Sequence, residues 1–153
     1  MTYFRFRSLI LSQLMSENTS LSEKYLIGTK HTYTRRFSFE DVNAFALLSG
    51  DVNPIHINRE AAAQSIFKQV VVHGMLTSAL FSTVFGTIYP GKGSIYLGQT
   101  LKFLKPVFLD DDITAEVELT EINMERKIGT FATRAFNGKK ELVIAGEAKI
   151  LLP

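Results

Sequence analysis

An aspartate and a histidine stand five residues apart in the segment Ser49-Gly-Asp-Val-Asn-Pro-Ile-His56. Glycine and proline bound the turn between them, and the apolar pattern of the flanking helices requires neither Asp51 nor His56. A carboxylate and an imidazole held together can bind one water molecule, because one group accepts its proton while the other orients it or returns a proton. A structural interpretation also fits this spacing, with Asp51 capping the next helix and His56 an ordinary half-buried histidine.

A second candidate feature is the pair His73-Gly74, which directly precedes a predicted helix over residues 75–89. Backbone N–H groups near Gly74 would point outward unpaired at the positive end of this helix. Glycine lets a ligand approach the backbone closely, so this helix start could stabilise a developing oxyanion. His73 itself is open between packing or capping and direct contact with a ligand. The third histidine, His31, is expected on the surface.

The helices that position these groups have clear start and stop signals. Ser38 offers an N-cap with Asp41 in the capping-box position, and Gly50 supplies the end of the helix. A short Ala-rich helix is predicted over residues 58–64. The helix over residues 75–89 is apolar on almost every side, which is typical of a buried helix.

Strands dominate the rest of the chain. The clearest period-2 alternation begins at Ile113, and Asn137-Gly138 is a strong hairpin signal. The predicted strands cover residues 31–37, 94–108, 113–120, 127–136 and 141–152. Four or five antiparallel strands with one buried helix indicate an α+β fold. We expect the sheet to wrap the helix, since nothing else in the chain is apolar enough to cover it.

Length and composition exclude several classes of protein. The 153 residues predict one domain over residues 29–153 after an N-terminal extension, residues 1–28. The absence of cysteine excludes disulfides, a thiolate zinc site and a cysteine nucleophile. Three separated histidines lack metal-ligand spacing, and Asp110–Asp112 lacks the EF-hand spacing, so we expect no metal. A net charge of +2 gives no pull toward nucleic acid, and polar residues interrupt the apolar stretch 70–89, so no membrane span is expected.

The N-terminal extension leaves the compartment open. Residues 1–16 contain Arg5 and Arg7, no acidic residue, and apolar residues at helical spacing, as mitochondrial transit peptides do. The other interpretation is an irregular extension, or translation that starts at Met15. We expect a cytoplasmic protein, with the mitochondrial matrix as the alternative if residues 1–16 are a transit peptide.

Three segments together resemble one known family. Leu48-Ser-Gly-Asp-Val-Asn-Pro-Ile-His56, Val72-His-Gly-Met75 and the segment 90–103 are similar to motifs of MaoC-like (R)-specific enoyl-CoA hydratases. The similarity runs from Arg36 to Leu152. It implies a hot-dog fold, in which an antiparallel sheet curls around one long helix, and a homodimer whose sheets join, with acyl-thioester sites near the subunit interface.

The resemblance also implies roles for individual residues. Asp51 and His56 match the catalytic pair, and the Gly74 N–H matches the oxyanion donor. Asn53 would hold the turn or orient the pair. Apart from the resemblance, His73 is counted as a further supporting residue because it directly precedes Gly74. Ser82 matches a position that lines the site. Of the helix side chains, Phe81 and Phe85 are candidates to line the acyl tunnel.

The activity implied is the reversible hydration of trans-2-enoyl thioesters to (3R)-3-hydroxyacyl thioesters, without a metal or redox cofactor. The substrate carrier is either CoA or acyl carrier protein, so a (3R)-hydroxyacyl-carrier-protein dehydratase of fatty acid synthesis is an alternative. A hot-dog acyl-CoA thioesterase is another, although such thioesterases do not use the Asp-x-Asn-Pro-x-His turn. A non-catalytic acyl-thioester binding module would be expected to lack the Asp/His pair.

Overall fold

A single antiparallel sheet of five strands forms the framework of the protein, whose computed structural model describes residues 24–153. The predictions for residues 1–16 therefore lie outside the described residues. The strands are β1 (Lys30–Arg35), β2 (Ile95–Phe103), β3 (Ile113–Asn123), β4 (Ile128–Phe136) and β5 (Leu142–Leu151). Their order is β1-β3-β4-β5-β2, so β1 and β2 are the two edges.

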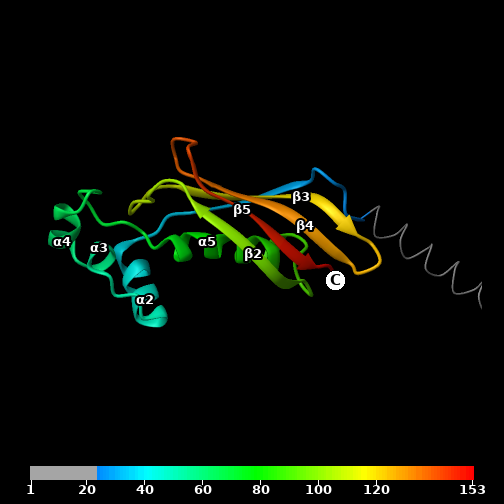
Figure 1. Cartoon of the computed structure of the whole chain (residues 1–153), viewed down its shortest axis with the longest axis horizontal. Coiled ribbons are helices and arrows are strands. Elements are labelled where there is room, and N and C mark those ends of the chain that lie inside the picture. The colour runs from blue at the N-terminus through cyan, green and yellow to red at the C-terminus, as the bar shows by residue number, and fades with distance from the viewer. Residues whose placement is uncertain (1–23) are drawn as a thin grey trace, which may run out of the picture.

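One helix lies along the sheet, and three others gather beyond one end of the sheet (Figure 1). The helix along the sheet is α5 (Gly74–Thr83), which continues into a π-helical turn, η1 (Val84–Ile88). The others are α2 (Phe39–Ser49), α3 (Pro54–Ile57) and α4 (Arg59–Gln64). No helix in the described part of the chain is both long and apolar enough to cross a membrane. The α+β hot-dog fold is confirmed.

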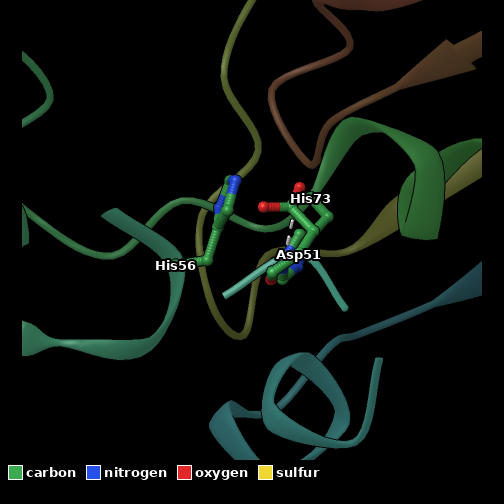
Figure 2. A group of neighbouring side chains, drawn as sticks. All are labelled: Asp51, His56 and His73. Atoms are coloured by element: carbon green, nitrogen blue, oxygen red, sulfur yellow. Dashed lines mark hydrogen bonds and ion pairs between the residues drawn. The ribbon is translucent and has the colours of Figure 1, made fainter. Parts of the chain in front are cut away.

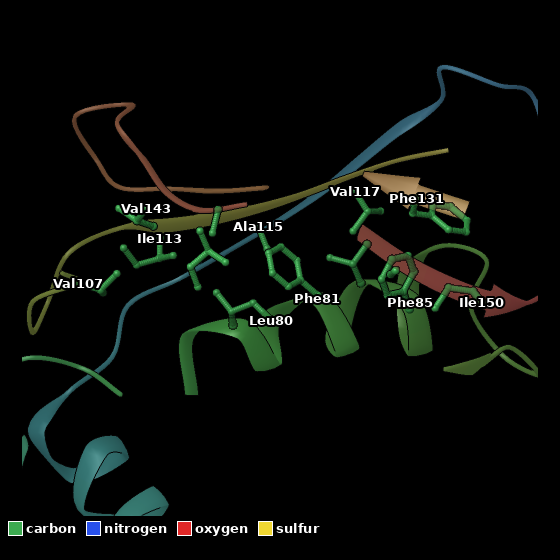
Figure 3. Close-up of a cluster of buried hydrophobic side chains, with 14 of the residues drawn as sticks. Leu80, Phe81, Phe85, Val107, Ile113, Ala115, Val117, Phe131, Val143 and Ile150 are labelled. Atoms are coloured by element: carbon green, nitrogen blue, oxygen red, sulfur yellow. The ribbon is translucent and has the colours of Figure 1, made fainter. Parts of the chain in front are cut away.

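Alternating side chains of the strands and one face of α5 build the core. Along β3, every second residue from Ile113 to Leu119 is fully buried, as the period-2 pattern predicted. Leu80, Phe81 and Phe85 project from the helical segment toward these strands (Figure 3). Burial of this apolar surface fixes the position of α5, and with it the start of the helix at Gly74.

The opposite face of α5 is open in the single chain, which corrects the expectation of a helix covered on all sides. Met75 and Ile88 are 58% and 42% exposed, and Ala79 and Ser82 between them are exposed as well. One sheet can contact only one side of a helix. An apolar face that the sequence assigned to the core therefore remains for another surface to cover.

The ends of the helices follow local capping chemistry. The Ser38 and Asp41 capping box is present, and Gly50 ends α2 in the left-handed conformation, with a φ of 80°. The predicted helix over residues 58–64 begins at Arg59, with Asn58 as its N-cap. The predicted helix over residues 75–89 begins at Gly74 and becomes a π-turn at Val84.

Two expectations about the periphery need revision. His31, expected on the surface, is half-buried, and its ring stacks on that of Tyr89 with 4.2 Å between centroids. This burial lowers the pKa of His31. Tyr25, which falls within the predicted extension 1–28, is buried in the core with its ring 5.9 Å from that of Tyr89.

The pairing of β2 with β5 depends on a close approach at Gly146. A Cβ atom added there would overlap the backbone oxygen of Thr100 and lie 2.9 Å from the Gln99 amide nitrogen. A backbone oxygen cannot rotate away, so the strands would have to part. We expect Gly146→Ala to lower the free energy of unfolding by about 1–3 kcal/mol in urea denaturation.

Gly98→Ala is the matched control, because Gly98 lies on the same strand pair and an added Cβ would meet nothing within 4 Å. Equal stability losses in the two variants would contradict the proposed close approach.

Candidate active site

The turn that carries Asp51 is held by backbone and side-chain hydrogen bonds. The Asp51 N–H donates to the Ser49 hydroxyl at 3.2 Å, and the Asn53 N–H donates to Asp51 Oδ1 at 3.3 Å. The Asp51 side chain is 54% exposed. The second carboxylate oxygen therefore remains available on the accessible side of the turn.

Asn53 and Pro54 start a helix that places His56. Asn53 is the N-cap of α3, with its side-chain oxygen accepting the Ile55 N–H at 3.3 Å, and Pro54 occupies the first helical turn. Proline is well suited to this position, because the N–H it lacks would have no partner there. Pro54 thus begins a new short helix after the turn.

His56 is buried, and its proton can be placed from its partner. Its Nδ1 lies 2.6 Å from the carbonyl oxygen of Val71. A carbonyl only accepts hydrogen bonds, so Nδ1 carries the hydrogen and Nε2 of the neutral ring carries a lone pair. His56 is thereby set up to accept a proton at Nε2.

His73 joins the other two residues from the start of α5 (Figure 2). Its Nε2 lies 3.0 Å from the Asp51 backbone oxygen and 3.9 Å from Asp51 Oδ2. Its ring stacks on that of His56, with centroids 3.8 Å apart and planes 28° from parallel. The structure therefore brings Asp51, His56 and His73 together from three segments of the chain.

Gly74 is the first residue of α5, where helical N–H groups lack intrahelical partners, and His73 provides no side-chain cap. A Cβ atom added to Gly74 would lie 2.7 Å from Cε1 of Phe103, at the end of β2. Glycine is needed here because the aromatic ring packs directly on the backbone. Phe103 was not singled out from the sequence, since no local signal indicates a contact between segments so far apart.

One cavity of about 520 Å³ connects these groups. Asp51, His56, His73 and Gly74 all line it, and the rest of the lining is mainly apolar. Its aromatic side chains are Phe45, Phe67 and Phe103. Ligand sites typically have this size and combine apolar walls with a few convergent polar groups.

Three residues expected near the site do not line this cavity. Phe81 and Phe85 are buried between helix and sheet, and the Phe85 ring packs edge-on against Tyr96, with 5.2 Å between centroids. Ser82 is exposed on the open face of α5. Within the single chain, none of the three reaches the Asp51–His56 cavity.

The donor set of one carboxylate and two imidazoles could suggest a metal site, since one ligand atom from each lies within 4.8 Å of the others. The ring geometry argues against it. The lone pair of an imidazole nitrogen lies in the plane of its ring, and two stacked rings with centroids 3.8 Å apart and planes only 28° from parallel direct their lone pairs alongside one another rather than at one ion. In addition, His73 Nε2 is already engaged in the hydrogen bond to the Asp51 carbonyl, so it offers no lone pair to a metal ion. The arrangement suits proton transfer better.

Comparison with known proteins adds to this geometry. Residues 23–138 match the MaoC like domain. The chain belongs to the MaoC-like domain family. The family resemblance read from the three sequence motifs is thus confirmed.

Two relatives illustrate the range of this MaoC-like family. An (R)-specific enoyl-CoA hydratase from Aeromonas caviae is 46% identical over 127 residues, which cover 83% of this chain and 95% of that protein. A mitochondrial 3-hydroxyacyl-[acyl-carrier-protein] dehydratase from Arabidopsis thaliana is 36% identical over 140 residues, which cover 88% of this chain and 83% of that protein.

Solved structures of MaoC-like hydratases match the fold. The (R)-hydratase from A. caviae aligns with a TM-score of 0.83 and 46% identity, covering 84% of this chain and 98% of that one. The R-hydratase PhaJ1 from Pseudomonas aeruginosa aligns with a TM-score of 0.81 and 43% identity, covering 84% and 83%.

Proposed function

We propose that this MaoC-like chain is an (R)-specific enoyl-CoA hydratase, a hydro-lyase that reversibly adds water to trans-2-enoyl thioesters to form (3R)-3-hydroxyacyl thioesters. The observation that carries the proposal is the meeting of Asp51, the His56 Nε2 lone pair and the start of α5 in one apolar cavity. Close relatives with this fold are named as such hydratases.

Asp51 and His56 form the acid–base pair of the proposed reaction. The pair holds a water molecule beside C3 of the substrate and takes a proton from it as the oxygen–C3 bond forms. The pair then returns a proton to C2, so the elements of water are added across the double bond. Positioned acid–base groups of this kind contribute about 10²–10⁴ in rate.

The start of α5 stabilises the negative charge that develops on the thioester oxygen during addition. Attack at C3 moves electrons onto the thioester oxygen and forms an enolate. The Gly74 N–H, at the positive end of α5, is placed to donate to that oxygen. One such donor is typically worth about 10²–10³ in rate.

CoA is the proposed carrier, in preference to acyl carrier protein. Acyl carrier proteins are acidic. Electrostatic complementarity with such a partner would favour a basic surface around the cavity mouth. Lys105 is the one lysine in the described cavity lining, and its Nζ is paired with Glu141 Oε1 at 2.6 Å. An acyl-carrier-protein thioester is the alternative substrate, because one relative is named as a 3-hydroxyacyl-[acyl-carrier-protein] dehydratase.

The cytoplasm is the proposed location. The mitochondrial matrix is the alternative, because the relatives from Arabidopsis thaliana and Solanum lycopersicum are named as mitochondrial proteins.

The proposed mechanism predicts that Asp51→Asn and His56→Gln each lower kcat for crotonyl-CoA hydration by about 10²–10⁴-fold, because each removes one group of the acid–base pair. The loss of enoyl-CoA absorbance measures the rate, and chiral analysis of the product should give the 3R alcohol. Asp111→Asn and His31→Gln are matched controls outside the cavity lining.

Wild-type turnover in both site variants would refute this mechanism. Release of free thiol from acyl-CoA without hydration would instead identify a thioesterase, and binding of enoyl-CoA without either reaction would identify a binding module.

We further propose that the enzyme is a homodimer in which a second copy covers the open face of α5 and the edge strand β2. Ile95, Leu97 and Phe103 on β2 are 54%, 51% and 52% exposed, and Met75 of α5 is also exposed. An edge strand offers unpaired backbone groups, so β2 of two copies can pair and continue the sheet. Such an interface would bury apolar side chains that one chain leaves in water.

The dimer predicts a solution mass of twice the 17.2 kDa chain in light scattering. Leu97→Glu should shift the enzyme toward monomer, because it puts a charge into the proposed apolar interface. Ile66→Glu is the matched control, since Ile66 is 88% exposed and follows α4, which lies beyond the end of the sheet (Figure 1). A monomeric wild type, or equal dissociation by the two substitutions, would contradict this interface.

Phe85 is proposed to limit acyl chain length once the dimer is formed. An acyl chain running along the covered face of α5 would pass Ser82 and meet Tyr96, whose ring packs against Phe85. Phe81, one turn earlier, is fully buried on the sheet side of α5 and does not border this open face.

We expect Phe85→Ala to raise kcat/KM for longer enoyl-CoAs relative to crotonyl-CoA, because the smaller side chain opens the end of the tunnel. Phe131→Ala is the control for core destabilisation, since Phe131 packs against the same ring from β4. An unchanged chain-length profile in Phe85→Ala would rule out this role.

A further inference from the structure

We propose that His73 is a positioning residue that holds both members of the acid–base pair in one geometry without acting on the substrate. The inference rests on the proposed hydratase function and concerns the same site. It assigns a separate task to each side of one buried imidazole: a hydrogen bond to the Asp51 backbone and a stacking contact with the His56 ring.

The hydrogen bond fixes the backbone from which the carboxylate projects. His73 Nε2 lies 3.0 Å from the Asp51 carbonyl oxygen, which can only accept, so Nε2 carries the hydrogen. The bond spans 22 residues in sequence and joins the exposed turn at Asp51 to the start of the packed helix α5. The turn thereby takes its position from the sheet-bound helix.

The other ring nitrogen supports a neutral His73. Nδ1 is buried and has no hydrogen-bond partner among the described residues, and the side chain is only 2% exposed. A charged ring would need a second acceptor there, because both nitrogens of an imidazolium donate. The surroundings therefore suit a ring protonated on Nε2 alone.

The stack fixes the plane of His56. The His73 ring contacts two others, with the His56 centroid at 3.8 Å and the Phe45 centroid at 4.9 Å. The hydrogen bond from His56 Nδ1 to Val71 sets one direction of its ring, and the stack restricts rotation about that direction. Together they aim Nε2, the atom proposed to accept a proton. A neutral neighbour also avoids like-charge repulsion when His56 receives that proton.

Two substitutions separate the contacts. His73→Phe keeps an aromatic ring against His56 but removes the donor to the Asp51 carbonyl. His73→Gln offers an N–H donor in place of Nε2 but removes the stack. Because misplaced reacting groups lose rate, we expect each variant to lower kcat for crotonyl-CoA by about 10–100-fold while KM changes little.

His31 supplies the matched control. It also stacks on an aromatic ring, with 4.2 Å between its centroid and that of Tyr89, but it lies outside the cavity lining. His31→Phe and His31→Gln should leave kcat and KM unchanged. Thermal unfolding of all four variants reports whether the fold is kept.

Double-mutant cycles test whether His73 acts through its two neighbours. In the Asp51→Asn background, His73→Phe should cause little further loss of kcat, and in the His56→Gln background the same should hold for His73→Gln. If the loss of kcat in each double variant equals the product of the losses in its two single variants, His73 acts independently of its neighbours and the proposal is overturned. Wild-type kcat in folded single His73 variants would overturn it as well.

A measurement on the unmodified enzyme applies even where the variants do not fold. Nitrogen NMR of histidine-labelled enzyme at neutral pH should find His73 uncharged and protonated on Nε2. A ring protonated on Nδ1, or on both nitrogens, would overturn the proposal.

A wild-type enzyme that does not hydrate enoyl-CoA would refute the hydratase function itself, whereas active wild type with unaffected His73 variants would refute only the role of His73.

Discussion

The packing of helix α5 on the five-stranded sheet is the constraint on which the rest of the structure depends. Leu80, Phe81 and Phe85 anchor the helix by burying apolar surface against the strands. Because the helix cannot slide or rotate without exposing that surface, its first residues are fixed as well. His73 and Gly74 lie at this fixed end, so the proposed oxyanion donor and the partner of the Asp51 turn take their positions from the core.

The opposite half of the site is built from a short exposed segment. Asp51 and His56 lie on the turn and helix that follow α2, where only His56 is buried. Such connections usually carry function on a rigid framework, and here hydrogen bonds to backbone oxygens hold the segment, including one from the Val71 N–H to the Ile55 carbonyl. The Val71 carbonyl accepts from His56, and the Asp51 carbonyl accepts from His73. Neither contact uses the Asp51 carboxylate or His56 Nε2, so Asp51 Oδ2 and His56 Nε2 remain available to a substrate.

Features set by neighbouring residues were readable from the sequence, whereas features set by distant contacts were not. The Ser38 capping box, the end of α2 at Gly50 and the alternation along β3 all appeared as predicted. The turn after Asn137 does form a hairpin between β4 and β5, although Lys140 rather than Gly138 adopts positive φ. The approach of Phe103 to Gly74 depends on how the edge strand lies beside the helix, and no local pattern encodes it.

The open face of α5 has the same physical origin and a functional consequence. Apolar periodicity predicts that a side chain is buried from water, but it does not indicate whether the same chain or a second copy buries it. The sheet covers the face with Phe81 and Phe85, and the face with Met75 and Ser82 is left exposed. Strand β2 borders that face and ends at Phe103, the residue packed on Gly74. A second copy seated on β2 would therefore complete the apolar cover and steady the strand that shapes the helix start, so that dimer formation and the geometry of the site would depend on one strand.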